Sequence, residues 1–244
     1  MNAILDWILN KPIAHRGLHS GDDRIPENSL SAFKEAVRKG FPIELDIHLL
    51  KDKQVVVFHD DDLKRVCGAS ININELTSTE IQAYQLFTSN EKIPLLKEVL
   101  ELVNGQVPLL IEIKGSKLNQ EIHEPLISLL NAYEGEIAIQ SFDPSLLKWF
   151  VSNAPHIFRG QLSGSYEDED IEPSLKDSYR NYMFNHLSKP DFIAHEAADL
   201  ARNAKVQDFK KQGVPVLAWT IRSKSQIKVV SSYCDNIIFE DFLP

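Results

Sequence analysis

The sequence predicts an α/β fold, a closed (β/α)8 TIM barrel, and three observations support this prediction. Nine short apolar runs alternate with amphipathic stretches, which is typical of parallel strands joined by helices. One pair of runs is joined by too few residues for a parallel crossover, so one run is the arm of a hairpin and eight remain. The 244 residues also suit a barrel of about 250 residues. A doubly wound open sheet is the alternative, but the chain has no G-x-G-x-x-G turn.

The apolar runs have the length of strands and lie between helical patterns. They are Pro12–His15, Ile43–Leu49, Val55–His59, Leu109–Lys114, Ile137–Phe142, Ile157–Leu162, Phe192–His195, Val216–Thr220 and Ile237–Phe239.

Helix signals occur in the stretches between these runs. Ser29–Lys39 carries apolar residues at helical spacing and is followed by Gly40, which suits a left-handed C-cap. Ser145–Val151 follows an Asp-Pro pair that predicts a cap and a first turn. Val206–Lys211 ends shortly before a glycine. The short stretch Ile4–Leu9 is expected to pack under the barrel as a plug.

The predicted hairpin extends the second strand. Only Leu50–Gln54 separates its two arms. If Asp52 and Lys53 form the turn, His59 lies opposite Asp46 and shares its face. No Asn-Gly or Asp-Gly pair is present to fix this register.

Charged residues cluster where several of these strands end. Glu44 and Asp46 are two residues apart and therefore face the same side of a strand. Glu112 and Lys114 repeat this pattern, and His15-Arg16 closes the first run. Any single pair is typical of a solvated strand face. The combination within otherwise apolar strands indicates a site, because buried charges must be paired or bind a metal.

The residue types indicate the chemistry of this site. Glu44, Asp46 and Glu112 offer only oxygen ligands, which suit Mg²⁺ or Ca²⁺, with Mn²⁺ as a further candidate. Arg16 and Lys114 provide positive charge for a phosphate, and histidines serve as general acid and base. A metal, two cations and a histidine pair suit the cleavage of a phosphodiester.

Eight segments, in order, resemble those of the glycerophosphodiester phosphodiesterases. They are IAHRG, PENSLSAF, IELDIHL, VVVFHDDDL, IPLLKEVL, LLIEIK, IAIQSFDP and VLAWT, and they span about Ile13 to Phe242. The resemblance implies a single barrel domain over residues 1–244, with a small insertion after His59, at about 60–105. It also implies hydrolysis of glycerophosphodiesters to glycerol 3-phosphate and an alcohol, with a divalent cation.

The resemblance also implies roles for individual residues. His15 and His59 match the acid/base pair, and Glu44, Asp46 and Glu112 match the metal ligands. Arg16 and Lys114 match phosphate-binding positions, Trp219 an aromatic residue on the glycerol side, and Glu27, with Asn28 and Ser29, a segment that either braces the loop or binds substrate.

Two segments depart from the family pattern and leave the choice of alcohol open. The insertion reads Arg65-Val66-Cys67-Gly68-Ala69-Ser70, without the usual second glycine. The last strand is followed by Glu240-Asp241, where Thr-Asp or Thr-Asn is usual. His48, two residues beyond Asp46, is expected past the barrel rim and partly solvated.

Composition excludes several classes of protein. A net charge of −9 argues against a nucleic-acid partner. Two cysteines without a CxxC pair argue against a disulfide scaffold or a zinc site and suit a reducing compartment. The absence of a signal-peptide pattern or a long apolar segment predicts a cytoplasmic protein without stable membrane anchoring.

The expected partner is a small glycerophosphodiester, and the sequence leaves the oligomeric state open. Two other functions stay open as well. One is a phospholipase D-like enzyme that acts on lysophospholipids or sphingomyelin. The other is a catalytically silent barrel module.

Overall fold

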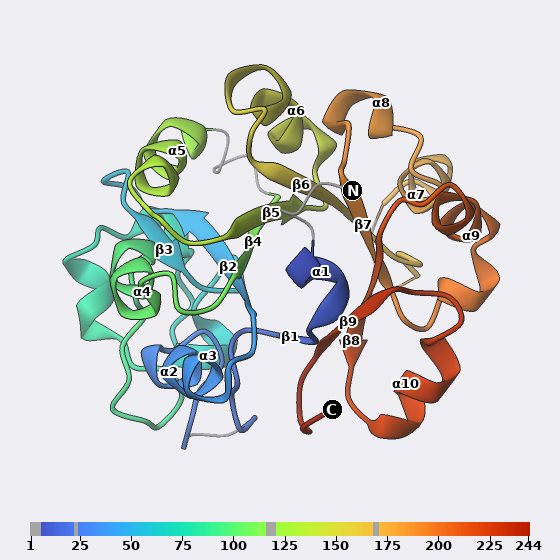
Figure 1. The fold of residues 1–244 in the computed structure, drawn as a ribbon. Coiled ribbons are helices and arrows are strands. Elements are labelled where there is room, and N and C mark those ends of the chain that lie inside the picture. Colours follow the sequence, from blue (N-terminus) through green and yellow to red (C-terminus); the bar gives the residue numbers. More distant parts are fainter. Residues whose placement is uncertain (1–5, 22–23, 116–120, 168–170) are drawn as a thin grey trace. The chain divides into compact units, whose positions relative to one another are not determined.

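A computed structural model of the protein (Figure 1) describes residues 6–21, 24–115, 121–167 and 171–244. In these residues nine strands form one sheet in the order β1-β9-β8-β7-β6-β5-β4-β2-β3, and β1 also pairs with β2. Eight strands thus follow one another in a closed cycle, and β3 is an additional strand bonded to β2. The predicted α/β barrel fold is confirmed.

Every predicted apolar run is a strand, with bounds that differ by at most two residues from the prediction. The strands are β1 (Ile13–Ala14), β2 (Ile43–Leu49), β3 (Val55–Val57), β4 (Leu109–Ile113), β5 (Ile137–Ser141), β6 (Phe158–Ser163), β7 (Phe192–Glu196), β8 (Val216–Ile221) and β9 (Asn236–Phe239).

The described residues group into two compact units, one of residues 14–137 and one of the remaining chain. The first contains α2 (Leu30–Lys39), α3 (Lys64–Cys67), η2 (Ile73–Glu75), η3 (Glu80–Ala83), α4 (Leu96–Val103) and α5 (His123–Asn131). The second contains α1 (Asp6–Asn10), α6 (Pro144–Asn153), α7 (Pro173–Arg180), α8 (Asn185–Ser188), η5 (Leu200–Arg202), α9 (Ala204–Lys211) and α10 (Lys224–Val230).

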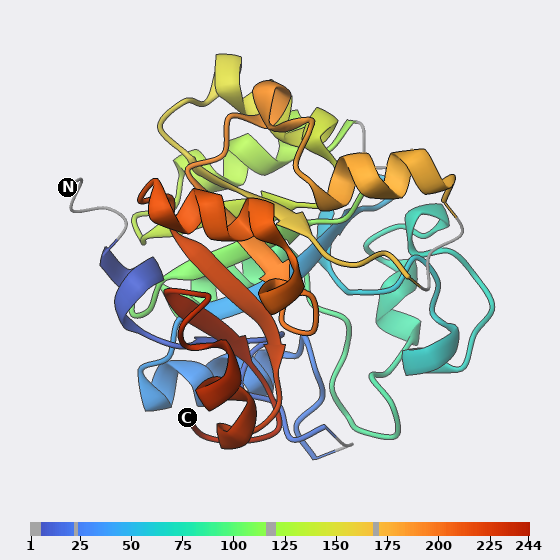
Figure 2. The ribbon, with the colours of Figure 1, turned by 90° about the vertical axis from the view of Figure 1, so that its right-hand side faces the viewer.

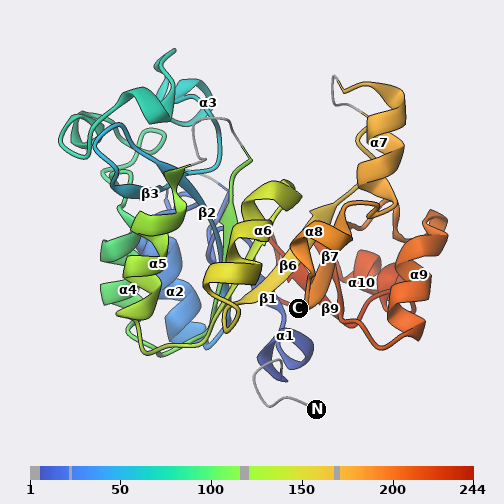
Figure 3. The same ribbon diagram turned by 90° about the horizontal axis from the view of Figure 1, so that it is seen from above.

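The helix α2 begins and ends where its sequence predicts. The Ser29 hydroxyl accepts a hydrogen bond from the amide of Ala32 at 3.1 Å, which satisfies one of the free donors of the first turn. Gly40 closes the helix in the left-handed conformation, at φ 73°. In the same unit α2 packs beside α4 (Figure 3).

The hairpin of β2 and β3 has a register one residue away from the prediction. Ile47 pairs with Val57, and the amide of Phe58 donates to the carbonyl of Asp46 at 3.0 Å. Phe58, and not His59, therefore lies opposite Asp46. The loop has three residues, 51–53, and Lys53 takes the left-handed conformation at φ 63°. This is a common hairpin connection, but a lysine gives no sequence signal for it.

The predicted insertion has a hydrophobic core of its own. Leu63 and Val66 of the segment around α3 pack with apolar residues of η2, η3 and the hairpin. This cluster holds α3 in place without contributions from the strands β1 or β4. Within the same stretch, α4 packs against β3 as well as α2 and forms part of the helical layer.

In the second unit, β8 and β9 pair in parallel (red in Figure 2). The Asn236 side-chain amide donates to the carbonyls of Ile8 and Lys11, each at 2.6 Å, and so ties α1 to β9. Residues 1–5, which include the first part of the predicted plug, lie outside the described residues. Among the described helices, none has the length and apolarity needed to cross a membrane.

Candidate active site

Three carboxylates meet on the strands β2 and β4 of the first unit. The two strands pair in parallel, so that Asp46 lies beside Glu112, and Glu44 lies on the same face two residues earlier. One oxygen from each carboxylate lies within 4.8 Å of the others. Glu44 and Asp46 are each 1% exposed and Glu112 is 7% exposed. Strand periodicity and a single strand pairing thus build the cluster that the sequence predicts.

Two carboxylates of this cluster have pKa values that are shifted in opposite directions. Burial, Asp46 and Glu112 raise the pKa of Glu44 well above its ordinary value, against the opposing effect of Arg16. Burial opposes the ionisation of Asp46, but Lys114, His59 and Arg16 outweigh it and lower the pKa of Asp46. Ionisation is therefore favoured at Asp46 and opposed at Glu44.

These residues fit a hard divalent cation. The donors are all carboxylate oxygens, which Mg²⁺, Ca²⁺ and Mn²⁺ accept. Burial and the two other carboxylates raise the pKa of Glu44, and a cation held by the trio would favour its ionised form. The buried trio could hold a divalent metal.

Two cations face the carboxylates. The Lys114 ammonium lies 2.8 Å from Glu112 and 3.4 Å from Asp46. The Arg16 guanidinium lies 3.4 Å from Asp46 and donates to Glu27 at 2.8 Å. Arg16 has a left-handed backbone, with φ 52°, and its amide donates to Glu44 at 3.0 Å. Both predicted phosphate-binding residues thus lie beside the acidic trio.

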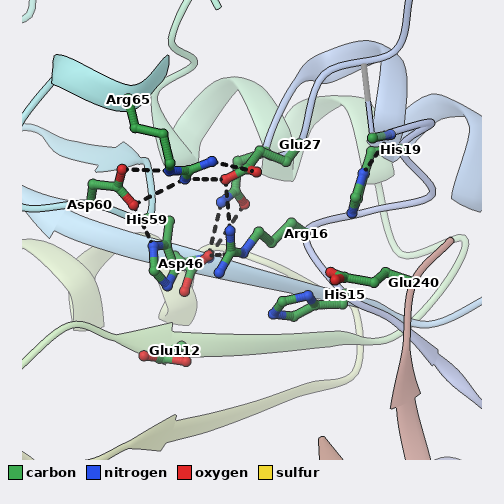
Figure 4. Close-up of polar contacts among 12 residues, drawn as sticks. His15, Arg16, His19, Glu27, Asp46, His59, Asp60, Arg65, Glu112 and Glu240 are labelled. Atoms are coloured by element: carbon green, nitrogen blue, oxygen red, sulfur yellow. Dashed lines mark hydrogen bonds and ion pairs between the residues drawn. The ribbon is translucent and has the colours of Figure 1, made fainter. Parts of the chain in front are cut away.

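The two predicted acid/base histidines lie close to the trio and are partly exposed. The side chain of His15 is 12% exposed, with Nε2 4.0 Å from Glu44. The side chain of His59 is 32% exposed, and its Nδ1 hydrogen-bonds to Asp60 at 2.6 Å. Both histidines contribute to the low pKa of Asp46, which requires both to be near it (Figure 4).

The segment of Glu27, Asn28 and Ser29, which follows the first strand, contacts the residues of this site. Asn28 is buried, and its amide donates to Asp46 at 2.9 Å. Asn28 is also left-handed, at φ 54°, and is followed directly by the N-cap Ser29. Asn28 and Ser29 thus brace this site, and Glu27 accepts hydrogen bonds from Arg16 and Arg65. A contact of Glu27 with the substrate stays a prediction.

Sequence reasoning placed His48 wrongly and missed the contacts of Asp60 and Arg65. His48 is fully buried rather than partly solvated, because the segment after β3 returns over the end of β2. Its Nε2 lies 3.2 Å from the carbonyl oxygen of His59, and burial lowers its pKa to about 4. Asp60 directly follows His59, and this position was a signal for a carboxylate that orients the histidine. No pattern of residues around Arg65 indicated that it contacts Glu27 and Asp60.

Trp219 lies on β8, in the second unit. Its ring packs edge to face against Phe142, with centroids 5.5 Å apart. Its indole nitrogen is buried and has no hydrogen-bond partner in the described part of the chain. Its contact with the glycerol side of a substrate stays a prediction.

Comparisons with known proteins show the family of this chain. Residues 15–243 match the model of the glycerophosphoryl diester phosphodiesterase family. A glycerophosphodiester phosphodiesterase of Caldanaerobacter subterraneus is 31% identical over 94% of this chain and 93% of its own length. Human lysophospholipase D is 37% identical over 52% of this chain and 43% of its own length.

A solved structure shows the same fold. The phosphodiesterase of Oleispira antarctica, in complex with the product sn-glycerol-3-phosphate, aligns with a TM-score of 0.79 at 25% identity, over 96% of this chain and 94% of its own. The protein therefore belongs to the class of TIM-barrel phosphodiesterases. Within that class, the chain belongs to the glycerophosphoryl diester phosphodiesterase family and is a hydrolase.

Proposed function

We propose that the protein hydrolyses glycerophosphodiesters to glycerol 3-phosphate and an alcohol, in a reaction that depends on a divalent cation. The observation that carries this proposal is the buried trio of Glu44, Asp46 and Glu112 beside Arg16 and Lys114. The product bound in the Oleispira antarctica relative supports it. Glu44, Asp46 and Glu112 would hold the cation, for which Mg²⁺ and Ca²⁺ are the first candidates and Mn²⁺ the third.

The cationic side chains bind and orient the phosphate. Arg16 presents a planar fork that matches two phosphate oxygens, and Lys114 contributes a point charge from the neighbouring strand. Both contact carboxylates in this structure, so an arriving phosphate competes with Asp46 for them. A cation held by the three carboxylates would add charge stabilisation for the phosphate oxygens.

The histidines move the protons. The Nδ1 of His59 is engaged by Asp60 at 2.6 Å, so Nε2 is the atom that exchanges a proton with the substrate. One histidine of the pair deprotonates the attacking hydroxyl, which belongs either to water or to the substrate itself. In the second case the attack closes a cyclic phosphate, and a water molecule must then open the ring to give glycerol 3-phosphate. The other, His15 or His59, protonates the leaving alcohol.

A panel of glycerophosphodiesters, assayed with Mg²⁺, Ca²⁺, Mn²⁺ or EDTA, tests this proposal. We expect release of glycerol 3-phosphate that EDTA abolishes and one of the cations restores. Full turnover in EDTA would contradict the role of the three carboxylates. A chain that turns over no member of the panel and shows no cation-dependent heat in calorimetry would be the silent module instead.

A lysophospholipase D activity is the second candidate, because human lysophospholipase D matches about half of this chain. Parallel assays of glycerophosphocholine and lysophosphatidylcholine separate the two functions. We expect the water-soluble diester to be the better substrate. A higher kcat/KM for lysophosphatidylcholine would assign the protein to the second function.

A further inference from the structure

A chain of charged side chains joins Arg16 to His59 through the insertion. Glu27 accepts from Nη1 of Arg16 at 2.8 Å, and it also accepts from Nη1 and Nη2 of Arg65 at 2.9 and 2.7 Å. The same Arg65 donates from Nε and Nη2 to Asp60, at 2.7 and 3.0 Å. Asp60 in turn engages Nδ1 of His59 at 2.6 Å. Arg65 is the central member of this chain (Figure 4).

The geometry of Arg65 suits two carboxylates at once. A guanidinium has donors on two edges in one plane, and Arg65 uses one edge for Glu27 and the other for Asp60. A lysine at this position has a single charged nitrogen and cannot span both partners in the same way. The side chain is 44% exposed, so its position is not determined by burial of the guanidinium.

The backbone of Arg65 is held by the core of the insertion. Leu63 is fully buried and Val66 is 3% exposed, and both belong to the cluster that packs with η2 and η3. The carbonyl of Val66 also accepts from the amide of Phe87 at 2.7 Å. The guanidinium therefore reaches the site from a segment that is packed into the core of the insertion.

The consequence of this arrangement appears when Arg65 is removed. Of the two arginines that contact Glu27, only Arg16 would then remain. We expect Glu27 to draw the guanidinium of Arg16 toward itself. Asp60 would lose both donors that fix the plane of its carboxylate, and so His59 would lose a fixed partner for Nδ1. Two groups assigned to phosphate binding and proton transfer would shift together.

We propose that Arg65 is a positioning residue that sets the orientation of Arg16 and His59 together, and that the insertion acts on the reaction through it. This inference rests on the proposed function. It assigns Arg65 no contact with the substrate, because its guanidinium is engaged by Glu27 and Asp60.

Three variants test the inference: Arg65→Ala, Arg65→Lys and, as a matched control, Lys64→Ala on the same helix. Misplaced catalytic groups commonly cost about 100-fold in rate, so we expect a loss of this size in kcat for Arg65→Ala. Arg65→Lys should recover only part of it, and Lys64→Ala should match the parent protein. All three variants should still bind the cation, because the carboxylate trio is intact.

Two results would overturn the inference. One is a kcat for Arg65→Ala within about twofold of the parent value, which is the level expected of an exposed ion pair without a positioning role. The other is a loss of activity that disappears at a lower temperature where the variant is fully folded, because this would make Arg65 a stabilising residue only.

A measurement without substrate separates this inference from the proposed function. In ¹⁵N spectra of the histidine side chains, we expect Nδ1 of His59 to show a hydrogen-bonded signal that changes in Arg65→Ala and not in Lys64→Ala. An unchanged signal would overturn the inference even in an active protein. If the parent protein cleaves no glycerophosphodiester, the proposed function fails, and the histidine spectra still decide whether Arg65 orients His59.

Discussion

His59 depends on the residue that follows it in the chain. Its Nδ1 is hydrogen-bonded to Asp60. This bond orients the ring and leaves Nε2 as the nitrogen that can exchange a proton with a substrate. His15 is followed in the sequence by an arginine and not by a carboxylate, and its Nε2 lies 4.0 Å from Glu44.

Replacing either histidine by alanine should remove proton transfer without unfolding the protein. General acid–base catalysis contributes about 10² to 10⁴ in rate, and we expect losses in this range in kcat for His15→Ala and His59→Ala. Thermal melting should be nearly unchanged because both rings are partly exposed. His156→Ala, an exposed position, is the control. Near-normal turnover by either active-site variant would contradict the assignment.

Glu44 should bind a cation only after releasing a proton. Its pKa lies well above the ordinary value because of burial and the neighbouring carboxylates. Below this raised pKa the group holds a proton, so cation affinity should fall as the pH falls. Calorimetry in buffers of different ionisation enthalpy measures the proton released.

The matched variant is Glu44→Gln, which has no proton to release. We expect it to bind the cation more weakly and without the buffer dependence. Glu35→Gln, which alters a carboxylate paired with Arg38 on α2, should bind like the parent protein. Equal affinity in Glu44→Gln would remove Glu44 from the ligand set.

Among the elements, α2 has the clearest sequence signals for its two ends, Ser29 and Gly40. The hydroxyl of Ser29 caps its first turn and also donates to the carbonyl of Pro26 at 2.6 Å. We expect Ser29→Ala to lower the free energy of unfolding by about 1 kcal/mol, measured by denaturant titration. Ser152→Ala, an exposed position within α6, is the control. An unchanged stability would mean that the cap is dispensable.

The hairpin shows the limit of such local reasoning. Its two arms were recognisable because five residues cannot make a parallel crossover. The register was not, because the left-handed residue of the loop is Lys53 and not glycine or asparagine. Even so, His59 lies near Asp46, since the chain leaves β3 at Val57 and turns back over the strand ends.

The stability of the whole molecule against acid should depend on Asp199 of the second unit. This carboxylate is 1% exposed and bonds to Arg180 at 2.7 Å and to His195 at 2.9 Å. Burial opposes its ionisation, but the hydrogen bonds from His195 and Arg180 outweigh it and lower its pKa. The folded pKa is thus below the unfolded value of about 3.9.

The sign of the effect follows from proton linkage. The folded state binds fewer protons than the unfolded state between these two pKa values, so this stabilisation is complete at neutral pH and is lost as the pH falls below about 4. Asp199→Asn should therefore be less stable than the parent at pH 7, and the difference should narrow in acid. Asp208→Asn, whose carboxylate is exposed, should show no such narrowing in urea titrations.

Most of the barrel and the acidic trio could be predicted because they follow from local periodicity. The face shared by Glu44 and Asp46 is set by the two-residue repeat of a strand. The single-domain organisation and the cellular location came from family resemblance or composition, and they stay predictions. So do the roles assigned to the site residues: His15, His59, Arg16, Lys114, Trp219 and Glu27, and metal binding by Glu44, Asp46 and Glu112.

By itself, the sequence determined the order of strands and helices, the ends of α2 and the residues that could bind a metal, since each depends on neighbours a few positions apart. Only the tertiary structure decided the hairpin register, the burial of His48 and the link from Arg65 to both Glu27 and Asp60. These depend on how distant segments pack, because Arg65 lies 38 positions from Glu27 and reaches it only when the core of the insertion holds α3 in place.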